Sequence, residues 1–433
     1  MRLFRSLYLW CGLAWLAAAG GAHAALTHEI TQGVEGAVPI AVVPFGPVGA
    51  NLPVDVAAVI TADLRRSGRF APIARDDLIA RPYEASQVNF RDWRLLKADN
   101  LVIGKVTPFG AGYVAQFQLF DVFRGVQLAG YSIRSDAKSL RRTAHKIADM
   151  IYETLTGEPG AFATRIAYIT VINGADGKRH YSLQVADSDG YNPQSVVKST
   201  QPLMSPAWSP DATRLAYVSF ENRLPKIYVQ DLRTGRRRLL AHFPGVNGAP
   251  AWSPDGTQMA LVLSKDGNPE VYVMDLATKR LRRLTDSLGI DTEPAWSPDG
   301  RFIIFTSDRG GSPQIYRIPS RGGHAQRLTF EGSYNARASY SADGKSIVMV
   351  HSGGDSRFRI AVLNLQNGAM QVLTDGKLDE SPSFAPNGRM IIYATEEKMR
   401  GVLAAVSVDG RVKQRLSARE GDAREPAWAP LRQ

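Results

Sequence analysis

The chain has 433 residues, of which 44% are hydrophobic and 21% are charged. This composition is that of a globular protein, and it excludes a disordered chain or a protein that crosses a membrane many times. The length predicts two domains. The formal net charge is +11, but the basic residues are spread along the chain and are densest at Arg236–Arg238. Because nucleic-acid binding needs basic residues gathered on one face with stacking aromatics, we expect no nucleic-acid partner.

The first 24 residues have the pattern of a secretory signal. Two arginines precede an apolar run that is too short to span a bilayer, and small residues stand before a cleavage site between Ala24 and Ala25. The single cysteine, Cys11, is lost with this segment, so the mature chain uses no disulfides. No later segment is long enough to cross a membrane. The sequence therefore predicts an exported protein that is soluble after cleavage.

A small α/β domain is predicted for residues 39–157. It combines buried strands with two helices that each carry one apolar face and end at a glycine. The expected elements are a strand at 39–43, a helix from Val56 to Gly68, strands at 101–106, 113–122 and 127–133, and a helix from Leu140 to Gly157. Residues 158–164 form a linker to the next domain.

An N-terminal arm, residues 25–38, precedes this domain. Leu26, His28 and Ile30 alternate with polar residues, so the arm has the period of a strand. It could add to the edge of a sheet, either in its own chain or in a partner. The alternative is a frayed terminus.

A repeat of constant length occupies the rest of the chain. The segment from Pro206 to Asp211, Pro-Ala-Trp-Ser-Pro-Asp, recurs with small changes, and its aromatic residue stands at positions 208, 252, 296, 340, 384 and 428. Every interval is 44 residues. Each copy is followed by an apolar strand, an alternating strand and a short last strand. Four strands in a repeat of 40 to 45 residues are typical of a β-propeller blade.

The ends of the repeat region predict how the ring closes. The sixth motif copy contributes one strand before the chain ends, and the three strands after Arg165 supply the remainder of that blade. Residues 165–433 are therefore predicted to form an all-β six-bladed propeller closed by a split blade. The repeated Ser-Pro-Asp-Gly element fits a turn between strands, and this role explains the repeated carboxylates without a metal.

No enzymatic site is evident in the sequence. There is no Gly-x-Ser-x-Gly motif, and the closest segment, Gly130 to Arg134, lacks the second glycine. The seven histidines have no metal-ligand spacing. The carboxylates of Asp291 and Glu293 lack a partner that could act as base or nucleophile. We therefore expect that the protein is not an enzyme.

The repeat strings resemble those of one family. Gln201 to Asp211 (Gln-Pro-Leu-Met-Ser-Pro-Ala-Trp-Ser-Pro-Asp) and Asn247 to Gly256 (Asn-Gly-Ala-Pro-Ala-Trp-Ser-Pro-Asp-Gly) are more specific than a generic blade motif. Together with the leader and the α/β domain, they are similar to the TolB family, the periplasmic components of the Tol-Pal system. The resemblance covers essentially the whole chain.

The resemblance implies a function and two partner surfaces. A TolB protein is a periplasmic scaffold that supports outer-membrane integrity and envelope constriction during cell division. It binds the peptidoglycan-associated lipoprotein Pal at one mouth of the propeller channel and the inner-membrane protein TolA through its N-terminal arm. The implied Pal-binding residues are Met204, Ser205, Asn247, Gly248, Ala249, Asp291, Thr292, Glu293, Asp379 and Glu380. The implied TolA-binding residues are Leu26, Glu29, Ile30, Gly33 and Val34.

Further expectations concern assembly, cofactors and alternatives. The chain is expected to be a monomer within a larger complex, which could include other outer-membrane lipoproteins. We expect that no cofactor is required. Propeller channels often trap ions, so the sequence leaves open whether calcium binds in the channel. Two other functions remain open, a propeller that binds peptidoglycan or carbohydrate and a propeller hydrolase without a recognisable active site.

Overall fold

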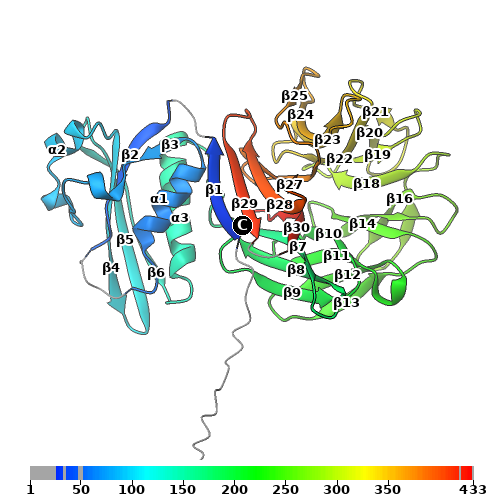
Figure 1. Cartoon of the computed structure of the whole chain (residues 1–433), viewed down its shortest axis with the longest axis horizontal. Coiled ribbons are helices and arrows are strands. Elements are labelled where there is room, and N and C mark those ends of the chain that lie inside the picture. Colours follow the sequence, from blue (N-terminus) through cyan, green and yellow to red (C-terminus); the bar gives the residue numbers. More distant parts are fainter. Residues whose placement is uncertain (1–25, 33–35, 47–51, 419–420, 432–433) are drawn as a thin grey trace, which may run out of the picture.

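The computed structural model describes residues 26–32, 36–46, 52–418 and 421–431. The predicted leader, the cleavage residues Ala24 and Ala25, and the arm residues Gly33 and Val34 lie outside these ranges. An α/β domain and a β-propeller lie side by side, and the strand β1 runs between them (Figure 1). Within the described residues, no helix is long and apolar enough to cross a membrane.

The α/β domain is built on one mixed sheet with the strand order β3-β2-β4-β5-β6. Its helices α1 (Val56–Arg66) and α3 (Leu140–Thr156) cover one face, and their apolar side chains form one core with the strands. Asp55 caps the start of α1, and Gly157 ends α3 with a φ of 75°. The strands are β2 (Val38–Val42), β3 (Phe70–Pro72), β4 (Asn100–Phe109), β5 (Gly112–Asp121) and β6 (Val126–Ser135).

The other face of this sheet is only partly covered. The short helix α2 (Phe90–Leu95) buries Trp93 against Leu101 and Ile103 of β4 in a second, smaller core. Two turns of 3-10 helix, η1 (Arg75–Asp77) and η2 (Ala85–Gln87), precede it in the chain. These three elements were not expected from the sequence, because each is too short for a helical apolar period to be recognised.

Six further sheets form the propeller. Four of them contain four strands in chain order, so each is an antiparallel blade made from one repeat. The first blade consists of β10 (Leu203–Trp208), β11 (Arg214–Ser219), β12 (Lys226–Asp231) and β13 (Arg237–Ala241), with the 3-10 turn η3 (Glu221–Arg223) after β11. The second consists of β14 (Asn247–Trp252), β15 (Gln258–Leu263), β16 (Glu270–Asp275) and β17 (Leu281–Arg283), and the third of β18 (Asp291–Trp296), β19 (Phe302–Ser307), β20 (Gln314–Pro319) and β21 (Gln326–Arg327). The fourth consists of β22 (Tyr334–Tyr340), β23 (Ser346–Ser352), β24 (Arg359–Asn364) and β25 (Met370–Val372).

The split blade predicted from the repeat is confirmed. Strand β30 (Asp422–Trp428) pairs with β7 (Arg165–Asn173), which continues to β8 (Arg179–Asp187) and β9 (Gln194–Ser199). The last and first strands of the propeller therefore share one sheet, and the ring is closed by backbone hydrogen bonds.

The repeated tryptophan joins consecutive blades. The indole N–H of Trp252 donates to the carbonyl oxygen of Ala207 in the preceding blade (3.2 Å), and Trp296 donates in the same way to Ala251 (3.1 Å). Trp208 donates to Ala427 (3.0 Å) and so repeats the bond across the closure. A buried indole N–H needs an acceptor, which explains why this residue recurs at one position of the motif.

The turn that follows the tryptophan holds one residue in the left-handed region. Gly256 and Gly300 occupy this position with φ of 70° and 71°, but the first blade has Ala212 there with φ of 52°. Since a left-handed conformation costs a residue with a Cβ about 1 kcal/mol, we expect Ala212→Gly to raise the free energy of unfolding by about that amount. Gly256→Ala should lower it by a similar amount, and chemical denaturation would measure both. Equal midpoints for Ala212→Gly and the natural protein would contradict this.

The arm forms a fifth strand on one blade. β1 (Leu26–Gln32) pairs antiparallel with β29 (Lys413–Ala418), in the sheet β1-β29-β28-β27-β26. The remaining strands of this sheet are β26 (Asp379–Phe384), β27 (Met390–Glu397) and β28 (Arg400–Ser407). Figure 1 shows β1, in dark blue, beside β29. Of the possibilities that the sequence left open for the arm, the structure shows addition to a sheet edge of the same chain.

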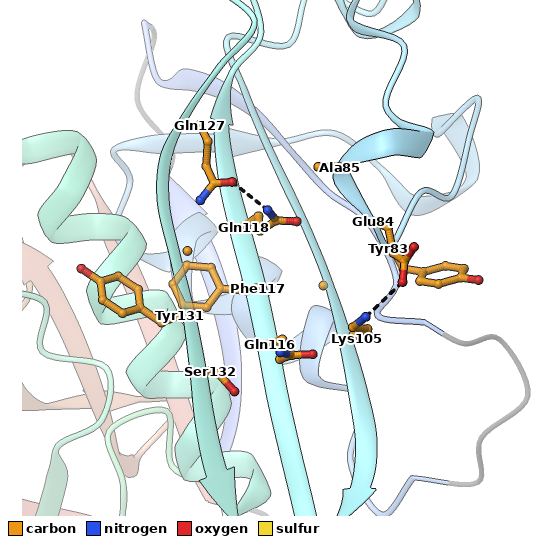
Figure 2. A pocket seen from close by; sticks show the side chains of 12 residues that line it. Tyr83, Glu84, Ala85, Lys105, Gln116, Phe117, Gln118, Gln127, Tyr131 and Ser132 are labelled. Atoms are coloured by element: carbon orange, nitrogen blue, oxygen red, sulfur yellow. Dashed lines mark hydrogen bonds and ion pairs between the residues drawn. The ribbon is translucent and has the colours of Figure 1, made fainter.

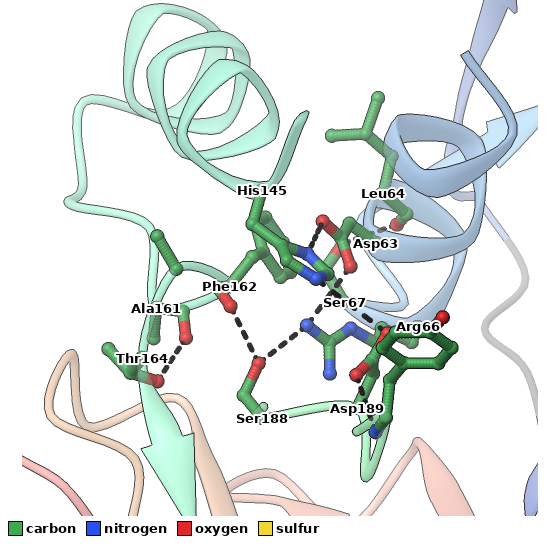
Figure 3. A network of polar contacts seen from close by, with 12 residues as sticks. Asp63, Leu64, Arg66, Ser67, His145, Ala161, Phe162, Thr164, Ser188 and Asp189 are labelled. Carbon is green, nitrogen blue, oxygen red and sulfur yellow. Dashed lines mark hydrogen bonds and ion pairs between the residues drawn. The ribbon is translucent and has the colours of Figure 1, made fainter. Parts of the chain in front are cut away.

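A buried polar network joins the two domains (Figure 3). His145 Nδ1 of α3 lies 2.6 Å from Asp63 Oδ2 of α1, and both side chains are 1% exposed. Arg66 pairs with Asp63 (3.0 Å) and donates to the hydroxyl of Ser188 in the β8–β9 turn of the propeller (2.8 Å). In the same turn, Asp189 pairs with Arg141 of α3 (2.5 Å). We call Asp63, Arg66, Arg141, His145, Ser188 and Asp189 the interdomain network.

Neighbouring charges in the network make the contribution of Asp189 to stability depend on pH. Burial alone would raise the pKa of Asp189, but the positive charges of Arg66, His145 and Arg141 lower it to about 2. A lowered carboxyl pKa contributes stability above the ordinary value near 4, and this stability is lost as the pH falls through about 2.

We expect Asp189→Asn to be less stable than the natural protein at neutral pH, by about 2 kcal/mol. The difference should shrink as the pH falls below about 4 and should disappear only below about 2, where the natural side chain is also neutral. Denaturant unfolding of both proteins at several pH values would measure it. A difference that does not change with pH would show that the lost contribution is not electrostatic.

Candidate functional site: the propeller mouth

One end of the propeller channel opens into a cavity of about 490 Å³. The innermost strands of all six blades line it, so no single blade makes the site. Most lining residues are small or apolar, with Met204 and Val246 about 40% exposed at its edge. A concave, largely apolar surface on a rigid ring suits an inserted protein loop.

A ring of six left-handed residues surrounds this cavity. Each lies where the innermost strand contains a β-bulge, so that the pairing with the second strand shifts. None is glycine, and the spacing is again 44 residues. The ring consists of Ser205, Ala249, Glu293, Arg337, Ser381 and Glu425, with φ between 44° and 56°. Bulges and left-handed non-glycine residues are concentrated at functional sites, where they redirect side chains.

Two glutamates of the ring fix the neighbouring blades. Glu425 Oε2 accepts the backbone N–H of Ser205 (2.6 Å) and the guanidinium of Arg337 (2.7 Å). Glu293 Oε2 accepts the backbone N–H of Arg337 (2.8 Å) and the hydroxyl of Thr306 (2.8 Å). Although burial would lower the pKa of Arg337, the charges of Glu425 and Glu293 raise it. Arg337 therefore keeps its charge in the channel, and the backbone around the cavity is held in place.

The structure brings most of the predicted mouth residues together. Seven of them line the cavity, namely Met204, Ser205, Asn247, Gly248, Ala249, Thr292 and Glu293. Asp291, Asp379 and Glu380 are not among its lining residues. Asp291 and Asp379 are at most 1% exposed, whereas Glu380 is half-buried and contributes to the raised pKa of Arg337.

The buried carboxylates have a structural role. Asp291 pairs with Arg309 (2.5 Å), and Asp379 accepts the hydroxyl of Thr395 (2.5 Å). Burial raises the pKa of both carboxyl groups. Asp291 and Asp379 stand at the first position of an innermost strand, where the side chain points into the blade instead of the channel. The spacing of the motif identified the loop. It could not tell which residue of the loop points into the blade and which one points into the channel.

Sequence reasoning missed several lining residues. Arg337, Ser381 and Glu425 complete the ring, and Pro382 and Pro426 adjoin it. The signal was present in the 44-residue period, since adding 44 to Glu293 gives Arg337. The fourth, fifth and sixth motif copies diverge from the first three, which makes the equivalent positions harder to recognise.

The arm residues lie at the outer edge of one of these six blades, the sheet β1-β29-β28-β27-β26. Leu26, Glu29 and Ile30 are in β1, at the edge opposite β26. Glu29 is exposed and lies 3.6 Å from Arg415, which also pairs with Glu397 (2.6 Å). In this arrangement one blade carries the docked arm at its outer edge and Ser381, a mouth residue, on its inner strand.

A second cavity of about 510 Å³ lies on the partly covered face of the α/β sheet (Figure 2). Its polar side chains bond to one another, as Lys105 pairs with Glu84 (3.0 Å) and Gln118 donates to Gln127 (2.7 Å). The side chains that could recognise a ligand are therefore partly satisfied. All of its lining residues belong to the α/β domain, whereas all six propeller blades contribute to the mouth.

Only one group of side chains in the described part of the chain has metal-ligand geometry, and it is Asp63, His145 and Asp189. Both of its carboxylates are paired with arginines, Arg66 and Arg141. Since a bound cation would have to displace these guanidinium groups, we assign the group to the interdomain network and not to a metal site.

Comparisons with known proteins agree with this architecture. Residues 152–432 match the TolB beta propeller domain, and residues 26–128 match the TolB amino-terminal domain. The crystal structure of TolB from Acinetobacter baumannii superposes with a TM-score of 0.88 at 44% identity, covering 94% of this chain and 100% of that one.

Curated relatives give the same result. The Tol-Pal system protein TolB of Nitrosococcus oceani is 57% identical over 238 residues, and that of Methylococcus capsulatus is 54% identical over 249 residues. These alignments span 55% and 58% of this chain and the same shares of the relatives, so the chain spans somewhat over half the length of the curated relatives it matches. The expectation that the chain is not an enzyme agrees with these names. From its propeller, its amino-terminal domain and these relatives, the chain belongs to the TolB family.

Proposed function

We propose that this protein is a periplasmic, non-enzymatic scaffold of the Tol-Pal system that binds the lipoprotein Pal at the propeller mouth and TolA through its N-terminal arm. In this role it supports outer-membrane integrity and envelope constriction during division. The observation that carries the proposal is the cavity of about 490 Å³ lined by all six blades. The names of the relatives support membership of the Tol-Pal system. The proposal requires no cofactor.

The mouth is suited to a protein loop because its surface is pre-organised. The six ring residues hold left-handed conformations before any partner arrives, and Glu293 and Glu425 fix the backbone between blades. A rigid site loses little conformational entropy on binding, so more of the contact energy remains as affinity. The rim residues Met204 and Val246 offer exposed apolar contacts around the opening.

Calorimetric titration with the soluble domain of Pal from the same organism tests the proposed binding of Pal at the mouth. We expect saturable binding with one site per chain. Absence of binding at high micromolar Pal, with protein shown to be folded by circular dichroism, would overturn the Pal assignment.

The arm is proposed to act by strand exchange. In the docked state β1 covers the edge of β29 with antiparallel backbone bonds. The same backbone groups would be available to the sheet edge of a partner once β1 is released, because a strand edge pairs with any suitable strand. Docking on the blade and binding to TolA would then exclude one another.

Deletion of residues 25–34 tests the proposed binding of TolA through the arm. The shortened protein should lose binding to the TolA periplasmic domain but retain Pal binding, since the mouth residues are unchanged. Arg124→Gln, which changes an exposed residue of the α/β domain outside the arm, is the control and should bind TolA. Unchanged TolA affinity of the shortened protein would contradict the role of the arm.

A further inference from the structure

Basic side chains gather on three consecutive blades at the end of the propeller away from the mouth. They lie in or beside the turns between the third and fourth strands. We call Arg236, Arg238, Lys279, Arg280, Arg282 and Arg321 the basic rim. All six residues are exposed, and none takes part in an ion pair among the residues that the structure describes.

Strand register places the rim opposite the mouth. In the first blade Met204, which lines the mouth, pairs with Val218, whereas Asp231, just before the rim turn, pairs with Arg214 at the other end of the same strand. A cavity of about 770 Å³ opens at this other end and is lined by Pro210, Asp211 and Arg233 among others. The rim is therefore accessible while the mouth is occupied.

The rim is continuous from blade to blade. Burial lowers the pKa of Lys279, and the positive charge of Arg238 on the preceding blade lowers it further, so these two cations lie close together. Arg282 donates to the carbonyl oxygen of Ser320 on the following blade (2.7 Å), next to Arg321. Three blades thus contribute to one positively charged surface.

Nearby carboxylates do not neutralise this charge. Asp231 accepts backbone N–H groups of its own turn from Arg233 (3.0 Å) and Thr234 (2.7 Å). Asp275 does the same with Ala277 (3.1 Å) and Thr278 (2.7 Å). These two carboxylates hold turn geometry, and the third turn, after Pro319, has no carboxylate. At the same end, the carboxylates of Asp211, Asp255 and Asp299 accept backbone N–H groups of their own turns. None of these five carboxylates forms an ion pair with a residue of the basic rim in the described part of the chain.

The composition and arrangement of the rim favour binding to a membrane surface over binding to a protein. Arg236 and Arg280 are 44 residues apart, so the blade repeat places their turns at the same height on the ring. No large hydrophobic residue is exposed in the described turns 231–236, 275–282 and 319–325, and Leu239, which follows Arg238 in β13, is 47% exposed beside the rim. Protein interfaces depend on buried aromatic and apolar anchors, whereas a basic surface with few apolar side chains suits the phosphates of anionic lipid headgroups.

We propose that the basic rim is an electrostatic docking surface for a membrane that carries anionic phospholipids. It holds the side of the propeller opposite the mouth against the headgroups without inserting into the bilayer. Unpaired arginine and lysine side chains supply the attraction, and this attraction is screened by salt. The inference does not depend on the identity of the mouth partner.

Vesicle co-sedimentation of the purified protein tests the rim. The probes are vesicles of phosphatidylcholine alone and vesicles that also contain phosphatidylglycerol. We expect sedimentation only with the anionic vesicles, strong at roughly 0.05 M salt and lost at about 0.5 M salt. The charge reversals Arg236→Glu, Arg280→Glu and Arg321→Glu, one per blade, should together weaken partitioning about 100-fold.

A matched control separates the rim from net charge. Arg91→Glu, Arg124→Glu and Lys146→Glu change three exposed cations of the α/β domain, so the net charge falls equally. This control should sediment like the natural protein, and thermal unfolding should show that both triple variants are folded. Three results would each overturn the proposal: no binding of the natural protein to anionic vesicles, an equal loss in the control, or binding to polyglutamate in place of vesicles, which would indicate an acidic protein partner.

Discussion

Ala249→Arg is expected to weaken binding of the soluble domain of Pal by about 100- to 1,000-fold. Ala249 lines the mouth cavity and belongs to the ring of left-handed residues, with a φ of 44°. An arginine side chain there would extend into a cavity of about 490 Å³ and fill part of it. The carboxylates of Glu293 and Glu425 would hold the new guanidinium in the channel, so it would remain in the path of the partner.

Calorimetry or surface plasmon resonance would measure this loss. The substitution adds no new backbone strain, because alanine and arginine both carry a Cβ, so the unfolding midpoint should change little. Ala277→Arg is the matched control, since Ala277 is exposed in a turn at the other end of the propeller. If Ala249→Arg bound Pal as tightly as the control does, the mouth would not be the Pal site.

Asp63→Ala is expected to lower the free energy of unfolding by about 3 to 5 kcal/mol. Asp63 is 1% exposed and its carboxylate contacts both His145 (2.6 Å) and Arg66 (3.0 Å). Removal of the carboxylate would leave a buried guanidinium without its acidic partner, and an uncompensated buried charge is far more costly than the loss of an exposed ion pair. A cavity left by the side chain adds to the cost.

The effect should reach the contact between domains. Arg66 links Asp63 to Ser188, and the carbonyl oxygen of Arg66 accepts the side-chain N–H of Gln414 in β29, the strand that pairs with the arm. We therefore expect the two domains of the variant to unfold less cooperatively than those of the natural protein, in a broader transition or in two transitions. Denaturant unfolding monitored by circular dichroism and tryptophan fluorescence would show it.

Asp76→Ala provides the reference for this experiment. Asp76 is exposed, and it takes part in no ion pair found in the described ranges, so its removal should change the free energy of unfolding by less than about 0.5 kcal/mol. A loss below about 1 kcal/mol for Asp63→Ala would mean that the network contributes specificity of packing and little stability.

Most of the fold could be predicted from local patterns. The 44-residue period gave the six blades, and the single strand left after the sixth motif predicted the split blade that β30 and β7 form. The apolar stripes of α1 and α3, each followed by a glycine, gave the helices of the first domain. These features depend on periodicity and on turn chemistry, and both are properties of residues close together in the chain.

The candidate site was predictable only in part. The motif-entering loops were found, but buried Asp291 and Asp379 could not be separated from Ser205 and Ala249, which face the channel. The bulge in each innermost strand decides this orientation, because one extra residue reverses the side to which the following side chains point. A bulge depends on pairing with the next strand, so it has no reliable signature in the strand itself.

The sequence by itself determined the blade number, the closure of the ring and the helices of the first domain, because repeats and apolar periods encode them locally. Only the tertiary structure decided which edge receives the arm, how Arg66 and Arg141 meet Ser188 and Asp189 across the domain boundary, and which turns combine into the basic rim. These contacts join residues that are far apart in the chain. Their partners are selected by packing, burial and charge after the elements have formed, and a single sequence does not carry that information.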